Sequence, residues 1–136
     1  MWKAKSMDRP RILIVDDEPG LVRLMTMILT TRYEVRSVVD ATQALEAVVE
    51  FKPDLVLLDW VMPQMHGGEV AQQIRADPRV SDTRILFHSA VLSKRDETHD
   101  MAGFPAIAKP IGMHELVEAI EDQLCDMPGS PDGMAE

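Results

Sequence analysis

The stretch RILIVDDEPGLVRLM, residues 11–25, contains the pattern that decides the fold. Arg11–Val15 is a short apolar run rich in branched residues, which suits a strand buried on both faces. Two acids follow, and Pro19 then suits the first turn of a helix that Asp17 can cap and that continues to Arg32. The stretch therefore predicts a strand, an acidic turn and a helix in succession.

The same alternation of strand and helix continues along the chain. The further predicted elements are a strand at Tyr33–Val38, a helix at Ala41–Phe51 capped by Asp40, a strand at Asp54–Leu58, a helix at Glu69–Ala76, a strand at Ile85–Phe87, a weakly marked helix at Ser93–Met101, a strand at Ala106–Ala108 and a last helix through Leu116 and Leu124. Alternation of five strands with five helices predicts a doubly wound α/β fold, an all-parallel sheet covered on both faces with right-handed crossovers.

Length and composition indicate one domain. A chain of 136 residues has room for one core, and no apolar run approaches the roughly 20 residues of a membrane span. The charged start of the chain does not resemble a secretion signal, so we expect a cytoplasmic protein without a membrane partner. We expect an N-terminal extension over residues 1–10, the domain over residues 11–126 and a disordered tail rich in Pro and Gly over residues 127–136.

The charge and the reactive residues exclude several kinds of site. A net charge of −9 argues against a nucleic-acid partner, because such sites gather Lys and Arg around phosphates. The single cysteine, Cys125, suits packing, and the four histidines do not show helical metal-ligand spacing. We interpret the histidines as structural or solvated, although His66 lies in a loop that borders the acidic end of the predicted sheet.

Polar residues follow four of the predicted strands at the same edge of the sheet. They are Asp16 and Asp17, Asp59, Ser89 and Lys109. Singly, each has a simple explanation as a helix cap, a turn residue, a loop hydroxyl or a surface amine. Together they point to a site, because functional groups of doubly wound sheets collect beyond the carboxyl ends of the strands. The converging acids would repel one another without a cation, and Mg²⁺ prefers such oxygen ligands.

At this point the sequence resembles a known family, the receiver domains of response regulators in two-component signal transduction, and within it the single-domain regulators of the chemotaxis type. The resemblance rests on four motifs: VDDE at Val15–Glu18, LLDWVMPQMHG at Leu57–Gly67, HSA at His88–Ala90 and AKP at Ala108–Pro110. It covers roughly residues 11–125 and implies a flavodoxin-like fold with strand order 2-1-3-4-5.

The resemblance also implies a role for each residue of the predicted site. Asp59 is the phosphoacceptor, and Asp17 and Asp59 bind Mg²⁺ directly. Asp16 binds Mg²⁺ largely through water, and the Val61 backbone carbonyl adds a ligand. Ser89 and Lys109 hold the phosphoryl oxygens, as phosphoryl transfer requires. The donor is a phosphohistidine on a histidine kinase or a histidine phosphotransfer protein.

Two departures from the family pattern concern the output. Ala106 stands where the family usually has an aromatic switch residue, and Phe104 followed by Pro105 replaces the usual turn. The signal is then expected to pass through the weakly marked helix. A downstream protein would dock on the face formed by that helix, the strand Ala106–Ala108 and the last helix. The resemblance also implies a cis peptide between Lys109 and Pro110.

The residues leave alternatives to a phosphorylated switch open. Ala106 favours a degenerate receiver that binds proteins without phosphorylation, whereas the acidic edge, Ser89 and Lys109 favour the switch. A phosphatase or other hydrolase would also use an Asp nucleophile and Mg²⁺. It would need a second acid-base group near the nucleophile, and Val61 offers none. We therefore expect a protein that catalyses its own phosphorylation and slow dephosphorylation and that is not a turnover enzyme.

Overall fold

The computed structural model describes residues 9–90, 100–109 and 112–125. The elements are β1 Arg11–Val15, α1 Pro19–Leu29, β2 Glu34–Val38, the 3-10 helix η2 Ala41–Gln43, α2 Ala44–Phe51, β3 Leu55–Asp59, α3 Gly67–Ala76, β4 Arg84–Ser89, β5 Asp100–Met101, β6 Phe104–Ala108 and α4 Met113–Cys125. The predicted extension, apart from Arg9 and Pro10, and the predicted tail lie outside the described residues.

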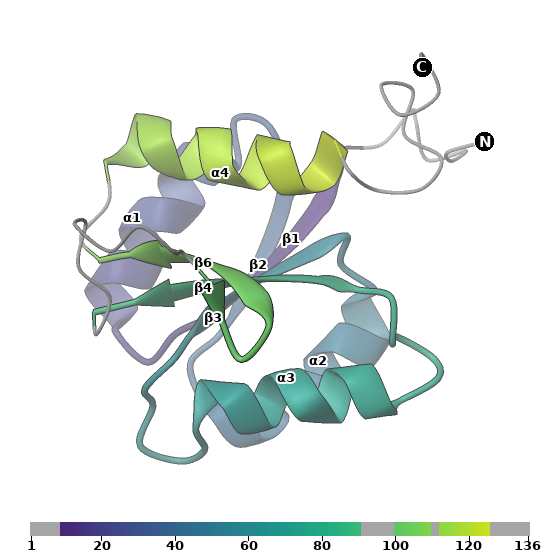
Figure 1. Ribbon diagram of the computed structural model, residues 1–136. Helices are drawn as coiled ribbons and strands as arrows, with labels where there is room; N and C mark the ends of the chain where they lie inside the picture. Colours follow the sequence, from purple (N-terminus) through teal and green to yellow (C-terminus); the bar gives the residue numbers. More distant parts are fainter. Residues whose placement is uncertain (1–8, 91–99, 110–111, 126–136) are drawn as a thin grey trace.

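The strands form one sheet in the order β2-β1-β3-β4-β6-β5 (Figure 1). The first five in this order are parallel, with β1 between β2 and β3. Since β6 is the fifth long strand along the chain, this is the predicted flavodoxin-like order 2-1-3-4-5. The fold class is therefore confirmed.

Helices cover both faces of the sheet, with α1 and α4 on one face and α2 and α3 on the other (Figure 1). Successive strand side chains point to opposite faces, so β1 sends Ile12 and Ile14 into the core under α1 and α4, and Leu13 and Val15 into the core on the other face. All residues of β3 are buried. The continuous apolar runs in the sequence are thus explained by a sheet buried on both sides.

The predicted N-terminal caps of the helices are confirmed in part. Pro19 lies in the first turn of α1 as predicted, but the N-cap is Glu18, without a side-chain hydrogen bond, so the prediction that Asp17 caps this helix is wrong. Asp40 does cap its helix, because its side chain accepts a hydrogen bond from the Thr42 amide. That segment begins as the 3-10 turn η2 before α2.

The segment before the last long strand differs from the prediction. Met101, predicted to lie in a helix, belongs to β5 and pairs antiparallel with Phe104. Two residues with positive φ, Ala102 at 52° and Gly103 at 84°, connect the strands. Two successive positive φ values are typical of the tight hairpin turn that matches the twist of a sheet. The part of the predicted helix before Asp100 lies outside the described residues, and the described part of the chain contains four α-helices where five were predicted.

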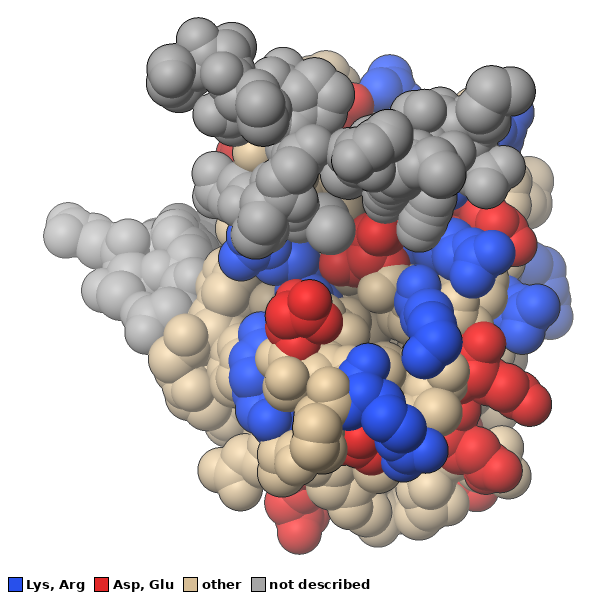
Figure 2. Space-filling model, turned by 90° about the vertical axis from the view of Figure 1, so that its right-hand side faces the viewer, with Lys and Arg blue, Asp and Glu red and all other residues tan. Residues whose placement is uncertain are grey.

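The edge of the sheet where the strands begin has charges of both signs. Figure 2 shows Lys and Arg beside Asp and Glu on this side of the molecule. Arg79 pairs with Asp77 at 2.6 Å, and Arg11 lies 3.4 Å from Glu34. The described side chains therefore form no single-sign patch on this side. None of the described helices is long and apolar enough to cross a membrane.

Candidate functional site

The candidate site lies at the edge where the parallel strands end. Asp16 and Asp17 follow β1, Asp59 is the last residue of β3, Ser89 is the last residue of β4, and Lys109 follows β6. The structure therefore brings all five sequence-predicted side-chain positions to one edge. Val61 lies two residues beyond Asp59 and is exposed.

The three acids converge. Asp16, Asp17 and Asp59 each offer a carboxylate oxygen, and these oxygens all lie within 4.8 Å of one another. Asp16 is 2% exposed and Asp59 is 5% exposed, whereas Asp17 is half-buried. Oxygen ligands at this spacing, partly open to water, fit a small divalent cation such as Mg²⁺, which keeps several waters when carboxylates bind it.

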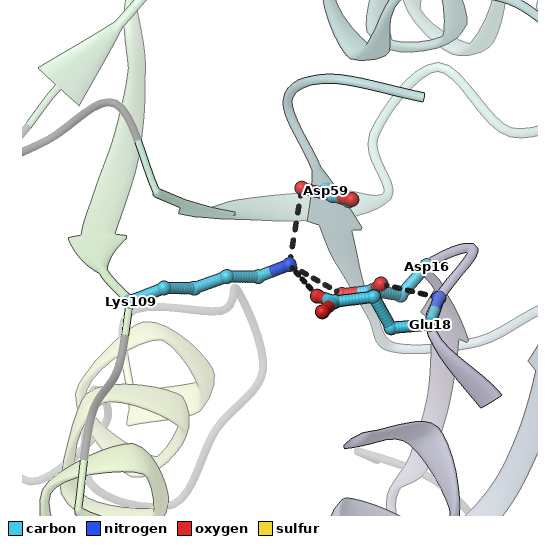
Figure 3. A network of polar contacts seen from close by, with 4 residues as sticks. All are labelled: Asp16, Glu18, Asp59 and Lys109. Atoms are coloured by element: carbon cyan, nitrogen blue, oxygen red, sulfur yellow. Dashed lines mark hydrogen bonds and ion pairs between the residues drawn. The ribbon is translucent and has the colours of Figure 1, made fainter. Parts of the chain in front are cut away.

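Lys109 reaches these acids from the far side of β4 (Figure 3). Its Nζ lies 3.0 Å from Asp16 Oδ2 and 3.3 Å from Asp59 Oδ1. It also donates to Glu18 Oε1 at 2.9 Å. The three protons of one ammonium are thus shared among three carboxylates. Glu18 is the member of this network that the sequence analysis did not single out, although it directly follows the acidic pair.

Burial and repulsion shift the protonation of the two inner acids. Burial, and then the charge of Asp16, raises the pKa of Asp59 to about 6. Burial also raises the pKa of Asp16, although the hydrogen bond from Lys109 opposes this change. Burial lowers the pKa of Lys109, but its bonds to Glu18 and Asp16 outweigh burial, and the net change is upward. Lys109 thus stays positively charged, but its single charge does not neutralise the negative charges of the surrounding carboxylates. Such an excess of negative charge is expected where a further cation binds.

Ser89 lies at the same edge of the sheet. It is fully buried at the end of β4, and its backbone carbonyl accepts a hydrogen bond from the Lys109 amide at 2.9 Å. This bond fixes the start of the Lys109 side chain relative to β4. The sheet thereby keeps the hydroxyl-bearing residue and the ammonium-bearing residue next to each other.

The N-terminus of α3 is hydrogen-bonded to the backbone of the residue that follows Asp59. The Gly67 amide donates to the Trp60 carbonyl at 2.8 Å. His66 caps α3, because its Nδ1 accepts from the Gly68 amide at 3.0 Å while Glu69 accepts from the His66 amide at 3.2 Å. The sequence analysis missed this cap, since His is not among the usual capping residues.

A row of aromatic rings leads away from the site. The Trp60 ring packs edge-to-face against Phe87 at 4.9 Å between centroids, and Phe87 packs similarly against Phe104 at 5.8 Å. Phe104 lies two residues before Ala106 on β6, and therefore on the same face. Ala106 is buried in this core and pairs in register with Phe87 of β4, so the small residue at the position where the resemblance predicts an aromatic lies beside a ring of the neighbouring strand.

His88 is a buried polar residue next to the site that the sequence analysis did not include in it. It lies in β4 beside Asp59 of β3 and is 2% exposed. Burial, with a contribution from the charge of Lys109, lowers the pKa of His88 to about 4, so the ring is uncharged at neutral pH. Within the described part of the chain, neither ring nitrogen has a hydrogen-bond partner.

Comparisons with known proteins agree with this geometry. Residues 12–121 match the family described as the response regulator receiver domain. The DNA-binding response regulator MtrA of Mycobacterium tuberculosis is 35% identical over 122 residues, which cover 85% of this chain and 51% of that protein. The DNA-binding dual master transcriptional regulator RpaA of Synechocystis is 31% identical over 114 residues, which cover 82% of this chain and 47% of that protein. The chain thus spans about half the length of these curated relatives.

The solved structures that are similar to this chain show the same architecture. A CheY-like response regulator receiver domain from Methanospirillum hungatei superimposes with a TM-score of 0.74 at 27% identity, and the match covers 86% of this chain and 94% of that one. The arrangement of the sheet and helices is therefore that of a known fold.

Proposed function

Because the chain belongs to the response regulator receiver domain family of two-component systems, we propose that it is a switch that accepts a phosphoryl group on Asp59. The observation that carries the proposal is the position of Asp59, a buried carboxylate beside two further acids and 3.3 Å from the Lys109 ammonium. An ammonium and a set of cation ligands around one carboxylate are what phosphoryl transfer requires, since its main need is positioning and charge neutralisation.

In the proposed reaction an oxygen of Asp59 attacks phosphorus, and the phosphorus–nitrogen bond of a phosphohistidine donor breaks. The donor imidazole leaves with the electron pair of that bond and is protonated. Lys109 neutralises the phosphoryl oxygens, and the Ser89 hydroxyl donates to one of them. Asp16, Asp17, Asp59 and the Val61 carbonyl would hold Mg²⁺, which supplies positive charge to the transferring group when bound.

Hydrolysis of the acyl phosphate is proposed to be slow, because no acid-base side chain stands at Val61 to activate water. The protein would then hold its phosphorylated state long enough to signal, and would not be a turnover enzyme.

The buried Ala106 supports a second candidate, a receiver that binds its partner without phosphorylation.

For the partners we propose a histidine kinase or a histidine phosphotransfer protein as the donor. A downstream protein would bind the face of β6 and α4 together with the chain before β5, whose residues 91–99 lie outside the described part. We propose that this domain acts in the cytoplasm through protein contacts and not on nucleic acid. The DNA binding named for MtrA and RpaA is a property of those longer proteins.

The test is incubation with acetyl phosphate and Mg²⁺ followed by intact-mass measurement. We expect the mass of one added phosphoryl group, no addition without Mg²⁺, and no addition to Asp59→Asn, which removes the nucleophile and keeps the shape of the side chain. Equal labelling of the Asn variant would refute Asp59 as the acceptor. Absence of labelling in the folded wild type, together with partner binding, would favour the second candidate.

A further inference from the structure

His88 faces the candidate site from the middle of the sheet. It pairs in register with Asp59 on one side and with Ile107 on the other. Leu86 and Leu57 belong to the core under α1 and α4, and His88 and Asp59 each lie two residues further along the same strands. Because strand side chains alternate between faces, the imidazole and the Asp59 carboxylate lie on the same face in adjacent strands.

The imidazole of His88 is buried at a cost that the described fold does not offset. An uncharged imidazole has one nitrogen that donates and one that accepts, and here neither has a partner within the described residues. A buried polar atom without a partner destabilises the fold, and such atoms in native proteins call for an explanation. A leucine at this position would fill the core without that cost, so the ring needs a role that an apolar side chain lacks.

The Lys109 side chain links the His88 ring to Asp59, the proposed phosphoacceptor. The lysine follows β6, and the acids that it binds belong to β3 and to the turn after β1, so its side chain has to cross β4 (Figure 3). Lys109 lies two residues beyond Ile107, the register partner of His88. His88 is therefore the residue of β4 that lies along the path of the lysine on this face.

Occupation of the site would change the hydrogen bonds of Lys109. In this structure its protons are shared among Asp16, Glu18 and Asp59. A divalent cation at the three acids would take carboxylate oxygens of Asp16 and Asp59, and the phosphoryl group would replace one oxygen of Asp59. The ammonium would then donate to a phosphoryl oxygen and to Glu18, and an unpartnered nitrogen of His88 is available for its third proton.

We propose that His88 is a positioning residue of the phosphorylated site: its free ring nitrogen accepts a hydrogen bond from Lys109 and holds the ammonium against the phosphoryl oxygens. The proposal rests on the function proposed above. Neither ring nitrogen has a partner among the described residues, and occupation of the site would give one of them a partner. The new hydrogen bond would offset part of the cost of burying the ring and would favour the cation-bound, phosphorylated form.

The experiment compares wild type with His88→Leu and His88→Gln, and uses His114→Gln as a control because the His114 side chain is 87% exposed on α4. Without Mg²⁺, His88→Leu is expected to melt several degrees higher, because two unpartnered atoms are removed. With Mg²⁺ and acetyl phosphate its labelling rate is expected to fall about tenfold, the effect of losing one hydrogen bond to a charged group. His88→Gln, whose amide oxygen can accept, should recover much of the rate.

Nitrogen NMR of the wild-type imidazole gives a readout that does not depend on a variant. The accepting nitrogen of His88 is expected to shift when Mg²⁺ and beryllium fluoride, a phosphoryl mimic, are added. If the wild type is labelled and His88→Leu is labelled at the same rate, or if the nitrogen does not shift, this inference is wrong while the proposed function stands. If the wild type itself is not labelled, the proposed function fails first. Should the Leu variant not fold, the Gln variant and the NMR shift decide.

Discussion

Gly67 lies against the backbone carbonyl of Asp59 so closely that a Cβ atom at position 67 would overlap that oxygen. The same atom would lie 2.9 Å from the Trp60 Cα, which is also backbone and cannot move aside by a rotamer change. The first residue of α3 and the acid at the end of β3 therefore share one rigid contact, and a shift of either displaces the other.

Replacement of Gly67 by Ala is accordingly expected to lower both stability and labelling. Forcing a methyl group into packed backbone typically costs about 1–3 kcal/mol, and part of the strain would move Asp59. Urea unfolding and the rate of labelling by acetyl phosphate measure the two effects. Gly20→Ala is the matched control, because nothing lies within 4 Å of a Cβ there, and it should leave both quantities unchanged or slightly raise stability. Equal behaviour of the two variants would contradict the contact.

The raised pKa of Asp59 predicts how stability depends on pH without Mg²⁺. The folded protein keeps the Asp59 proton up to a pH of about 6, whereas the unfolded chain releases it near the ordinary value of 3.8. Between these values the folded state binds more protons, so the free energy of unfolding falls as the pH rises. Thermal melts over this range test the sign. Asp59→Asn should make the free energy of unfolding depend less steeply on pH in this range.

Mg²⁺ at pH 7 should raise the melting temperature, because it binds the folded state and not the unfolded chain. Curves that coincide with and without Mg²⁺ would contradict a metal site.

Lys109→Met is expected to destabilise the protein at neutral pH. Removal of the ammonium leaves Asp16 and Asp59 buried without their cation, and breaking a buried pair in this way typically costs about 3–5 kcal/mol. Mg²⁺ should restore part of the stability but not the labelling, since the charge on the phosphoryl oxygens is then incompletely neutralised. Arg23→Met, at an exposed position of α1, is the control for loss of one positive charge. A Lys109 variant labelled at the wild-type rate would refute its proposed role.

The cap of α3 gives a prediction about His66. His66→Ala removes the acceptor of the Gly68 amide and is expected to cost about 1 kcal/mol of stability. His66→Asp should restore the cap, because a carboxylate accepts the same bond and its charge suits the N-terminus of a helix. Urea unfolding of the three proteins is the measurement. If the Ala and Asp variants are equally stable, the cap contributes nothing.

The sheet and the acidic edge could be predicted because each depends on short-range patterns. Continuous apolar runs such as Arg11–Val15 occur where a strand is buried on both faces, and the residue that follows such a run is placed at the edge by topology alone. The sequence therefore predicts the positions of Asp16, Asp59 and Lys109 at this edge.

The features that were missed depend on contacts between distant residues or on unusual local geometry. The strand β5 is only two residues long, and its turn places Ala102 at a positive φ that alanine seldom adopts, so neither periodicity nor turn composition indicated a hairpin. The role of Glu18 follows from a bond to a residue 91 positions away. The lack of a hydrogen-bond partner for His88 among the described residues follows only from the three-dimensional neighbours of its ring.

The crossing of β4 by Lys109 has a consequence for the synthesis of the protein. A chain leaves the ribosome from its N-terminus, so Asp16, Glu18 and Asp59 are made well before the lysine that neutralises them. Until β6 has joined the sheet, the acids of a nascent chain lack their internal cation and Asp59 lacks the group that would steady a phosphoryl oxygen. Under the proposed function, a nascent chain would thus become able to accept a phosphoryl group only once β6 is in place.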